Sequence, residues 1–247
     1  MTHAPEVGPR IGFLTPTLDP PAVSMSATMS GIDRLRQRFP GRVEHIIVDG
    51  GSAPASVNSW REKTDTVVID APRTNISEAL TIGWQSATAD FVVVMCAGDV
   101  PLENVFAAGR LLDLSGLSLG VFPVQNQDGT VSAPRRRPTA IQSSWTHAGL
   151  VARRDLLDSV GGYNRRYQFA MDWEWLSRAE TRGVRFEMFP DHAAVTETEP
   201  FALSQRRFFS AAGEFLDVLA RDCPGRFHRL AVAGRHLPAY SRALLRR

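Results

Sequence analysis

Five consecutive apolar residues restrict the fold of this chain more than any other feature of its sequence. They are Phe91-Val92-Val93-Val94-Met95, and they lack the polar alternation of a strand with one face in water. A strand that is apolar on both faces is expected where helices cover both sides of a parallel sheet. The rest of the chain must therefore supply neighbouring strands and the helices that cover them.

The first half of the chain has strand and helix signals in strict alternation. Met25, Met29, Ile32, Leu35 and Phe39 recur every three or four residues, which predicts a helix. The predicted strands are 10–14, 43–48, 66–69 and 91–95, and the predicted helices are 22–39, 56–63 and 76–87. Short links in a β-α-β order favour right-handed crossovers and an open, mostly parallel α/β sheet flanked by helices, as in Rossmann-like folds.

The second half of the chain is less regular, and its elements are predicted one at a time. Gln127-Asp128-Gly129-Thr130 is a hairpin turn signal, and Gly161-Gly162 ends a helix. Helices are predicted at 102–114, 153–160 and 172–181, and strands at 119–124 and 184–189.

Polar residues gather at the carboxyl ends of the predicted strands and in the loops that follow. Ligands of open α/β sheets bind beyond these ends, so we expect the side chains to converge although they are distant in sequence. They are Thr15, Thr17, Asp49, Ser52, Arg73 and Asp99.

Asp99 is delivered to this edge by the apolar strand, through Ala97 and Gly98. A divalent cation prefers hard oxygen ligands, and a carboxylate at a strand end can hold one against a diphosphate. An aspartate at this place is also a common turn or cap residue, so both interpretations stay open.

Charge and cysteine content exclude several classes of protein. The formal net charge is +2, which is too small for a protein that binds nucleic acid over its whole surface. Cys96 and Cys223 are too few for a disulfide framework or a zinc cluster, and they suit a reducing, cytoplasmic compartment. We expect no secretory signal and no membrane span, although the chain could lie on the inner face of a membrane.

The segment 201–247 differs in composition from what precedes it. Its arginines outnumber its acidic residues, and Phe208, Phe209, Phe215 and Phe227 are interleaved with them. This pattern predicts basic amphipathic helices that pack on the preceding domain, on a second subunit or on an anionic membrane. We therefore predict a catalytic domain at 1–200 and a helical extension at 201–247. The strip Arg135-Arg136-Arg137 is either a phosphate-binding site or a solvated charge run.

Three segments together resemble family 2 glycosyltransferases of the GT-A fold, of the kind found in bacterial glycan and polysaccharide biosynthesis. The similarity spans roughly residues 10–195. The segments are His45-Ile46-Ile47-Val48-Asp49-Gly50-Gly51-Ser52, the stretch from Ile76 to Asp99, and Val160-Gly161-Gly162-Tyr163-Asn164 with Phe169-Ala170-Met171-Asp172-Trp173-Glu174-Trp175-Leu176.

The resemblance implies that the chain binds a nucleoside-diphosphate sugar and acts as a hexosyltransferase. Thr15 and Asp49 would contact the base and ribose, and Ser52 would support their loop. Thr17, at the end of the first strand, belongs to the same predicted donor site. Arg73 would reach the base or a phosphate.

The resemblance also implies an inverting reaction on a glycan or lipid-linked acceptor. Asp99 would bind Mn²⁺ or Mg²⁺ and the diphosphate, with His192 as a further metal or phosphate ligand. Asp172 would be the general base, and Glu174 is the second candidate. Asp172 could also be a helix cap. Positions 172 and 174 lie about 200° apart around a helix, so only one of them should face the site.

The chain departs from the family pattern at the metal motif, where Ala97-Gly98-Asp99 has a single carboxylate. This departure keeps a second function open, that of an inactive, glycosyltransferase-like partner protein that binds nucleotides. A dehydrogenase is disfavoured because Thr15-Pro16-Thr17-Leu18-Asp19 replaces the glycine-rich turn after the first strand. A nucleotidyltransferase is disfavoured because its glycine-rich basic loop is missing there too.

Overall fold

A computed structural model describes residues 8–132, 146–196 and 208–222. All seven elements predicted in the first half are present, with ends shifted by at most a few residues. They are β1 (Ile11–Thr17), α1 (Ala22–Arg38), β2 (Val43–Asp49), α2 (Pro54–Arg61), β3 (Thr66–Asp70), α3 (Ile76–Ser86) and β4 (Phe91–Val94).

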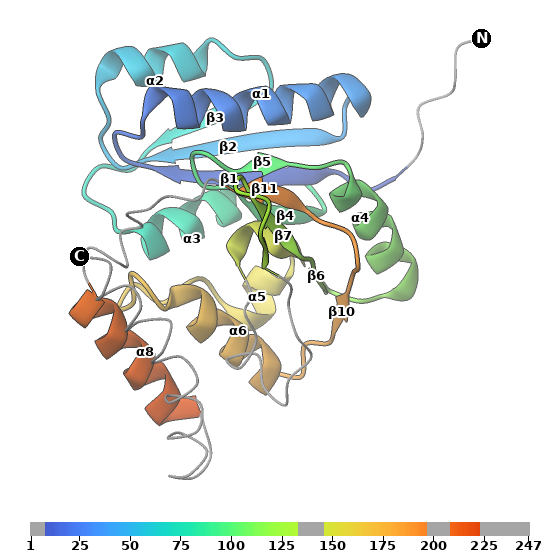
Figure 1. Cartoon of the computed structure of the whole chain (residues 1–247), viewed down its shortest axis with the longest axis vertical. Coiled ribbons are helices and arrows are strands. Elements are labelled where there is room, and N and C mark those ends of the chain that lie inside the picture. The colour runs from blue at the N-terminus through green and yellow to red at the C-terminus, as the bar shows by residue number, and fades with distance from the viewer. Residues whose placement is uncertain (1–7, 133–145, 197–207, 223–247) are drawn as a thin grey trace.

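The central sheet has seven strands in the order β10-β6-β9-β4-β1-β2-β3. β1 lies between β2 and β4 and pairs parallel with both, and β3 continues the parallel part beyond β2. β9 (Leu150–Arg153) is the exception, because it runs antiparallel to β4 and to β6 (Leu119–Val121). The predicted open, mostly parallel α/β sheet is confirmed (Figure 1).

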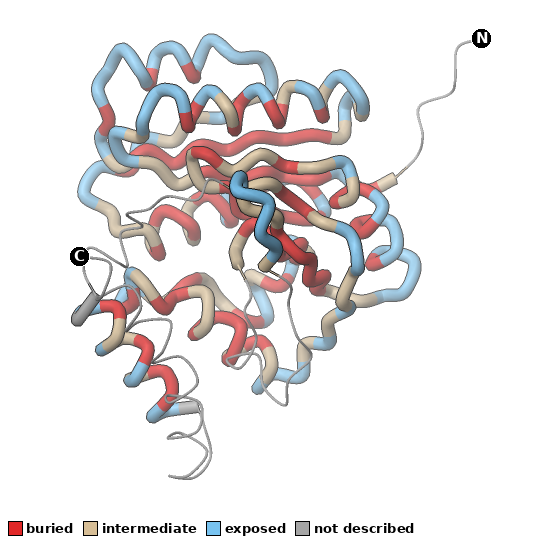
Figure 2. The backbone as a smooth tube through the Cα atoms, in the orientation of Figure 1, coloured by how far each residue is buried: buried red, intermediate tan, exposed pale blue. Residues whose placement is uncertain are grey.

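Helices cover both faces of the sheet, as the apolar segment 91–95 required. One face buries Ile11, Phe13 and Val93 against α1 and α4 (Asn104–Ser115). The opposite face buries Leu14 and Val92 against α3, α5 (Leu156–Val160) and α6 (Met171–Thr181). Figure 2 shows the central strands mostly buried, whereas the outer helices and turns carry many exposed residues.

The predicted strand 119–124 is wrong in its length, because the chain leaves the central sheet after Val121. Pro123 has no N–H to donate to a sheet ladder. The segment is divided into β6 in the central sheet and β7 (Val124–Asn126) in a second one.

The predicted helix 153–160 begins too early. Arg153 is the last residue of β9 and pairs with Phe91 of β4, so the helix is restricted to α5. The antiparallel strand β9 was missed because four residues are too few to show a period.

A second sheet of four short strands was also missed. Its order is β5-β11-β7-β8, formed by β5 (Val100–Pro101), β11 (Ala194–Thr196), β7 and β8 (Val131–Ser132). The hairpin predicted at 127–130 joins β7 to β8, with Gly129 at a positive φ of 83°. The strand predicted at 184–189 is present in part, as β10 (Phe186–Met188).

The predicted C-terminal helices are described only in part, as α8 (Phe208–Asp222), which packs on α6. The basic strip 135–137 and the other parts of 201–247 lie outside the described residues, so the predicted boundary at residue 200 stays a prediction. Within the described ranges, every helix is too short or too polar to span a bilayer.

The close approach of α3 to the sheet depends on Gly83, which gives a first test of the packing. A Cβ there would lie 2.0 Å from Leu14 Cδ1 and 2.9 Å from Val48 Cγ2. We expect Gly83→Ala to lower the free energy of unfolding by about 1–3 kcal/mol, because the core would be overpacked. Gly213→Ala in α8 is the matched control, since nothing lies within 4 Å of its Cβ. It should raise that free energy by about 0.5–1 kcal/mol. Denaturant unfolding measures both, and a change of the same sign in both would contradict the packing.

Candidate functional site

The carboxyl ends of β1, β2 and β3 form one continuous edge. Thr17 is the register partner of Asp49, and Asp49 is the register partner of Asp70. Register partners on parallel strands project to the same side of a sheet, so these three side chains lie in a row. The loop after β4 continues the edge, because Met95 N donates to Leu14 O at 2.9 Å.

Asp49 is buried, and only one of its two carboxylate oxygens has a partner among the described residues. Its Oδ2 accepts from the main-chain N–H groups of Gly51 and Ser52, at 3.0 and 2.9 Å. Its Oδ1 is buried and accepts nothing within the described chain. Thr17 Oγ1, on the neighbouring strand β1, is also buried and has no hydrogen-bond partner among the described residues. A buried polar atom without a hydrogen bond costs about 1–3 kcal/mol, so this pair is a candidate ligand contact.

A hollow lies beside Asp49, between the end of β3 and α2. Its wall includes Ser52, Arg61 and Asp70, and Arg61 Nη2 donates to Asp70 Oδ2 at 2.5 Å. A carboxylate, a hydroxyl and a paired guanidinium are thus available to a ligand that enters there.

Ser52 joins the loop after β2 to the loop after β1. Its Oγ accepts from Asp19 N at 2.8 Å, and Asp19 Oδ1 accepts from Ala53 N at 3.0 Å. These two bonds join the loop after β1 to the loop after β2.

Thr15 has a different environment from the one predicted. Its side chain is fully buried, and its Oγ1 shares a hydrogen bond of 3.0 Å with His45 Nε2. The Thr15 hydroxyl is therefore already hydrogen-bonded inside the fold, beneath the sheet edge. Arg73 lies at the surface in the left-handed region, with φ of 66°. Such a conformation is uncommon for arginine and points to a constraint on its loop.

The loop that carries Asp99 is fixed by α1. Gly98 N donates to Thr28 Oγ1 at 2.9 Å, and Thr28 Oγ1 donates to Cys96 O at 3.2 Å. Asp99 Oδ2 accepts from Cys96 N at 2.8 Å, which turns the carboxylate back over the strand end. Gly98 has φ of 104°, a conformation that L side chains rarely adopt.

The structure does not bring His192 to Asp99. β5 and β11 are antiparallel, with Val100 opposite Val195 and Pro101 opposite Ala194. His192 precedes β11, and its main-chain O accepts from Asn104 Nδ2 at the start of α4. No group of three His, Cys, Asp or Glu side chains capable of holding a metal occurs in the described part of the chain.

The two carboxylates of α6 separate as the helical spacing predicts. Glu174 is buried and binds Arg178 through both oxygens, at 2.9 Å each. Asp172 is only partly buried, and its Oδ1 accepts from Trp173 N at 2.8 Å. Asp172 is not the cap of α6, because Ala170 occupies that position.

Asp172 lies near the rings of His147 and Tyr163. Burial lowers the pKa of His147, and the charge of Asp172 opposes that shift. Burial, with an added effect of Asp172, raises the pKa of Tyr163. His147 Nε2 is buried without a partner among the described residues. Both groups are therefore neutral near pH 7.

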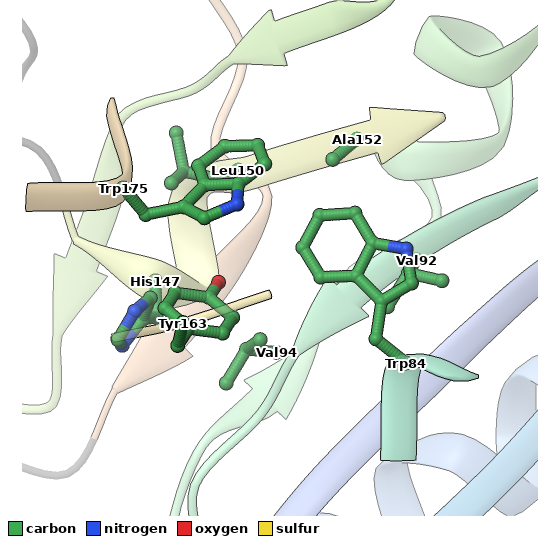
Figure 3. Close-up of a pocket in the computed structure, with 8 residues that line it drawn as sticks. All are labelled: Trp84, Val92, Val94, His147, Leu150, Ala152, Tyr163 and Trp175. Carbon is green, nitrogen blue, oxygen red and sulfur yellow. The ribbon is translucent and has the colours of Figure 1, made fainter. Parts of the chain in front are cut away.

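The rings of His147 and Tyr163 line a small cavity, drawn in Figure 3. They meet edge to face, with centroids 5.7 Å apart. The cavity measures about 10 Å³, room for one water at most, so it is no substrate pocket. Trp175, which also lines the cavity, is a buried core residue. The cavity is lined by Trp84, Val92, Val94, His147, Leu150, Ala152, Tyr163 and Trp175.

Solved structures with the same arrangement are glycosyltransferases. The mannosyltransferase PcManGT from Pyrobaculum calidifontis, solved with GDP-Man and Mn²⁺, is 20% identical with a TM-score of 0.66, over 98% of this chain and 75% of its own. TarS from S. aureus is 14% identical with a TM-score of 0.64, over 92% of this chain. This chain has the GT-A glycosyltransferase fold.

The predicted GT-A fold is thereby confirmed, and the likeness extends to TarS 1-349 solved with UDP-GlcNAc, at 14% identity and a TM-score of 0.63, over 92% of this chain and 71% of that one. The chain spans only 43% of the longer TarS structure. No family model matches the sequence, and no curated protein matches it either.

His45, beneath the edge, provides a test of this part of the GT-A fold. Burial, with a smaller effect of Arg36, lowers the pKa of His45 from 6.5 to about 3. The unfolded chain therefore takes up the proton first as the pH falls below 6.5, and stability declines toward pH 3. Between pH 7 and 5 we expect the wild type to lose about 2 kcal/mol more than His45→Gln, which keeps a partner for Thr15. Urea unfolding at both pH values measures the difference. Equal losses would mean that folded His45 is protonated as easily as a free histidine.

Proposed function

We propose that this chain is an inverting glycosyltransferase that moves a sugar from a nucleoside-diphosphate sugar to an acceptor hydroxyl. The observation that carries the proposal is the single sheet edge that combines the unpartnered Asp49 Oδ1 and Thr17 Oγ1 with the fixed Asp99 loop. The fold supports it, since PcManGT and TarS were solved with GDP-Man, UDP or UDP-GlcNAc.

The base and ribose of the donor would lie against Asp49 and Thr17, with Ser52 holding the loop. Thr15 would act through its packing beneath them, because its hydroxyl already binds His45. Arg73, exposed in the next loop, would reach a phosphate as a bidentate donor.

Asp99 is the one residue of the proposed metal site. A divalent cation commonly takes one or two protein carboxylates and completes its shell with substrate phosphate and water. A single carboxylate after β4 suits a cation that arrives with the diphosphate, whereas His192 precedes β11 and its main-chain O binds Asn104 of α4. When bound, Mn²⁺ or Mg²⁺ would supply positive charge to the leaving diphosphate.

Asp172 would be the general base of the transfer. Its carboxylate takes the proton of the acceptor hydroxyl as that oxygen bonds to the anomeric carbon. The bond from that carbon to the diphosphate oxygen breaks on the opposite face, which inverts the configuration. Glu174 is the weaker candidate, because both of its oxygens already bind Arg178.

The acceptor would be a glycan or a lipid-linked sugar, in polysaccharide or glycolipid biosynthesis. A cytoplasmic setting, with contact to the inner membrane face or to a second subunit through the basic C-terminal segment, belongs to the same proposal. A second candidate is a nucleotide-binding partner protein without transferase activity. It is favoured by the lone carboxylate in Ala97-Gly98-Asp99.

Donor binding and catalysis can be separated by two substitutions. We expect one of UDP, GDP, dTDP and CDP to raise the melting temperature when Mn²⁺ is present, because ligands of the folded state stabilise it. Asp99→Asn should weaken the Mn²⁺-dependent part of that shift. Asp172→Asn should keep the shift but lower kcat about 10²–10⁴-fold.

The readouts are thermal shift and release of the nucleoside diphosphate, with Asp191→Asn as an exposed control. A wild type that none of the four diphosphates stabilises would refute the proposal. Normal binding without any turnover would favour the partner protein.

Asp49 further restricts the base of the donor. Because Gly51 and Ser52 occupy Oδ2, only Oδ1 remains, which suits the single N3–H of uracil or thymine better than the two donors of guanine. In Asp49→Asn the same N–H groups would hold the amide oxygen, so the NH₂ group would replace Oδ1. That group suits the N3 acceptor of cytosine.

We therefore expect Asp49→Asn to shift the ratio of UDP to CDP affinity by about tenfold or more in favour of CDP. Isothermal titration with the two diphosphates measures it. Asp191→Asn, at an exposed aspartate outside this sheet edge, makes the same change and should leave the ratio unchanged. Tighter wild-type binding of GDP than of UDP would contradict this choice of base.

A further inference from the structure

Helix α8 is fastened to α6 by apolar contacts. Phe215, Val218 and Leu219 are buried in the same core as the sheet face that α6 covers. The rings of Trp173 and Phe215 meet at 64° with centroids 4.4 Å apart. A helix held in this way is part of the folded domain in that region and lies next to Asp172.

Glu214 of α8 binds the segment 168–170 that leads into α6. Ala170 stands at the N-cap of α6 and has no side chain that could cap it. The carboxylate of Glu214 instead accepts from the main-chain N–H groups of Gln168, Phe169 and Ala170, at 2.7 to 3.1 Å. A carboxylate there also interacts favourably with the helix dipole.

A second set of bonds joins α8 to the same segment from the other side. Tyr167 Oη donates to Asp217 Oδ2 at 2.6 Å, and burial together with this bond raises the pKa of Tyr167 to about 12. Arg221 Nη2 lies 3.4 Å from Glu174 Oε1. Arg178, the main partner of Glu174, donates to Val160 O and Gly162 O at 2.7 Å each.

These contacts hold the chain immediately before and after Asp172. The loop 168–170 is bound by Glu214, and Glu174 is bound by Arg178 and Arg221. Asp172 itself makes no hydrogen bond to α8 in the described residues, so its place depends on these flanking anchors.

We propose that α8 is a positioning element of the active site and that Glu214 is a positioning residue for Asp172. This inference rests on the proposed function, in which Asp172 is the general base. Glu214 touches neither donor nor acceptor; it fixes the segment 168–170 from which α6 begins, and thereby the direction in which the Asp172 carboxylate approaches the acceptor hydroxyl. Misplacement by about 1 Å can cost 10²-fold in rate.

The test is Glu214→Gln in the full chain, with the nucleoside diphosphate that stabilises the wild type as probe. We expect kcat for diphosphate release from the matching donor sugar to fall about 10- to 100-fold. The dissociation constant of the diphosphate should stay within about twofold of the wild type, because the donor edge lies on β1 and β2. Amide exchange at residues 168–170 should become faster.

Glu62→Gln at the exposed end of α2 makes the same charge change far from α6 and should alter none of these quantities. If Glu214→Gln fails to fold, Tyr167→Phe replaces it. That variant keeps the ring, removes the hydroxyl that binds Asp217 and Arg221 of α8, and should lower kcat in the same direction.

The outcomes separate this inference from the proposed function. Faster exchange at 168–170 with unchanged kcat would make Glu214 a stabilising residue only and overturn the inference. Loss of diphosphate binding together with kcat would overturn it too, because the effect would then be global. A wild type that binds no nucleoside diphosphate would refute the proposed function, and the positioning role of Glu214 would fall with it.

Discussion

The burial of β1 between two parallel partners is the constraint on which the rest of the structure depends. Thr17 and Asp49 end level with each other only because the β1–β2 register extends from Ile11 and Val43 to their last residues. β4 pairs on the other side of β1 and releases the chain toward Asp99. A slip of one residue would turn Asp49 to the opposite face, so the apolar pattern of these strands fixes the polar edge as well.

The parallel half of the sheet could be predicted from sequence because each of its elements is long enough to show its own period. The other half could not. β5, β9 and β11 have two to four residues each, and they exist through pairing with partners distant in sequence. Pro123 was the available sign that the segment 119–124 does not continue as one strand. The hairpin at 127–130 could be predicted because its turn depends on residues within the turn itself, such as Gly129 at a positive φ.

Some residues of the candidate site could likewise be identified from local sequence, and others could not. The loops at Asp49 and Asp99 are shaped by hydrogen bonds from their own next residues, so short motifs could identify them. Thr15 was predicted to face the ligand, yet its strand position says nothing about His45, thirty residues away, which takes up its hydroxyl. His192 was grouped with Asp99 by residue type alone, and only the β5–β11 register separates them. Only the fold brings the rings of His147 and Tyr163 close to Asp172, because the three residues come from separate segments of the chain.

The two sides of the proposed reaction therefore differ in how they are held. The donor edge is rigid by itself, because Ser52, Asp19 and Thr28 tie its loops to neighbouring helices and strands. The Asp172 carboxylate accepts one hydrogen bond from the neighbouring Trp173 N, and the segment that leads into its helix is bound by Glu214 of the distant α8. The bonds that hold the donor edge all lie within the first 98 residues of the chain, whereas the contacts around Asp172 come from residues 168–221. The lone Asp99 is consistent with this division, since a diphosphate already held at a rigid edge needs fewer protein ligands for its cation.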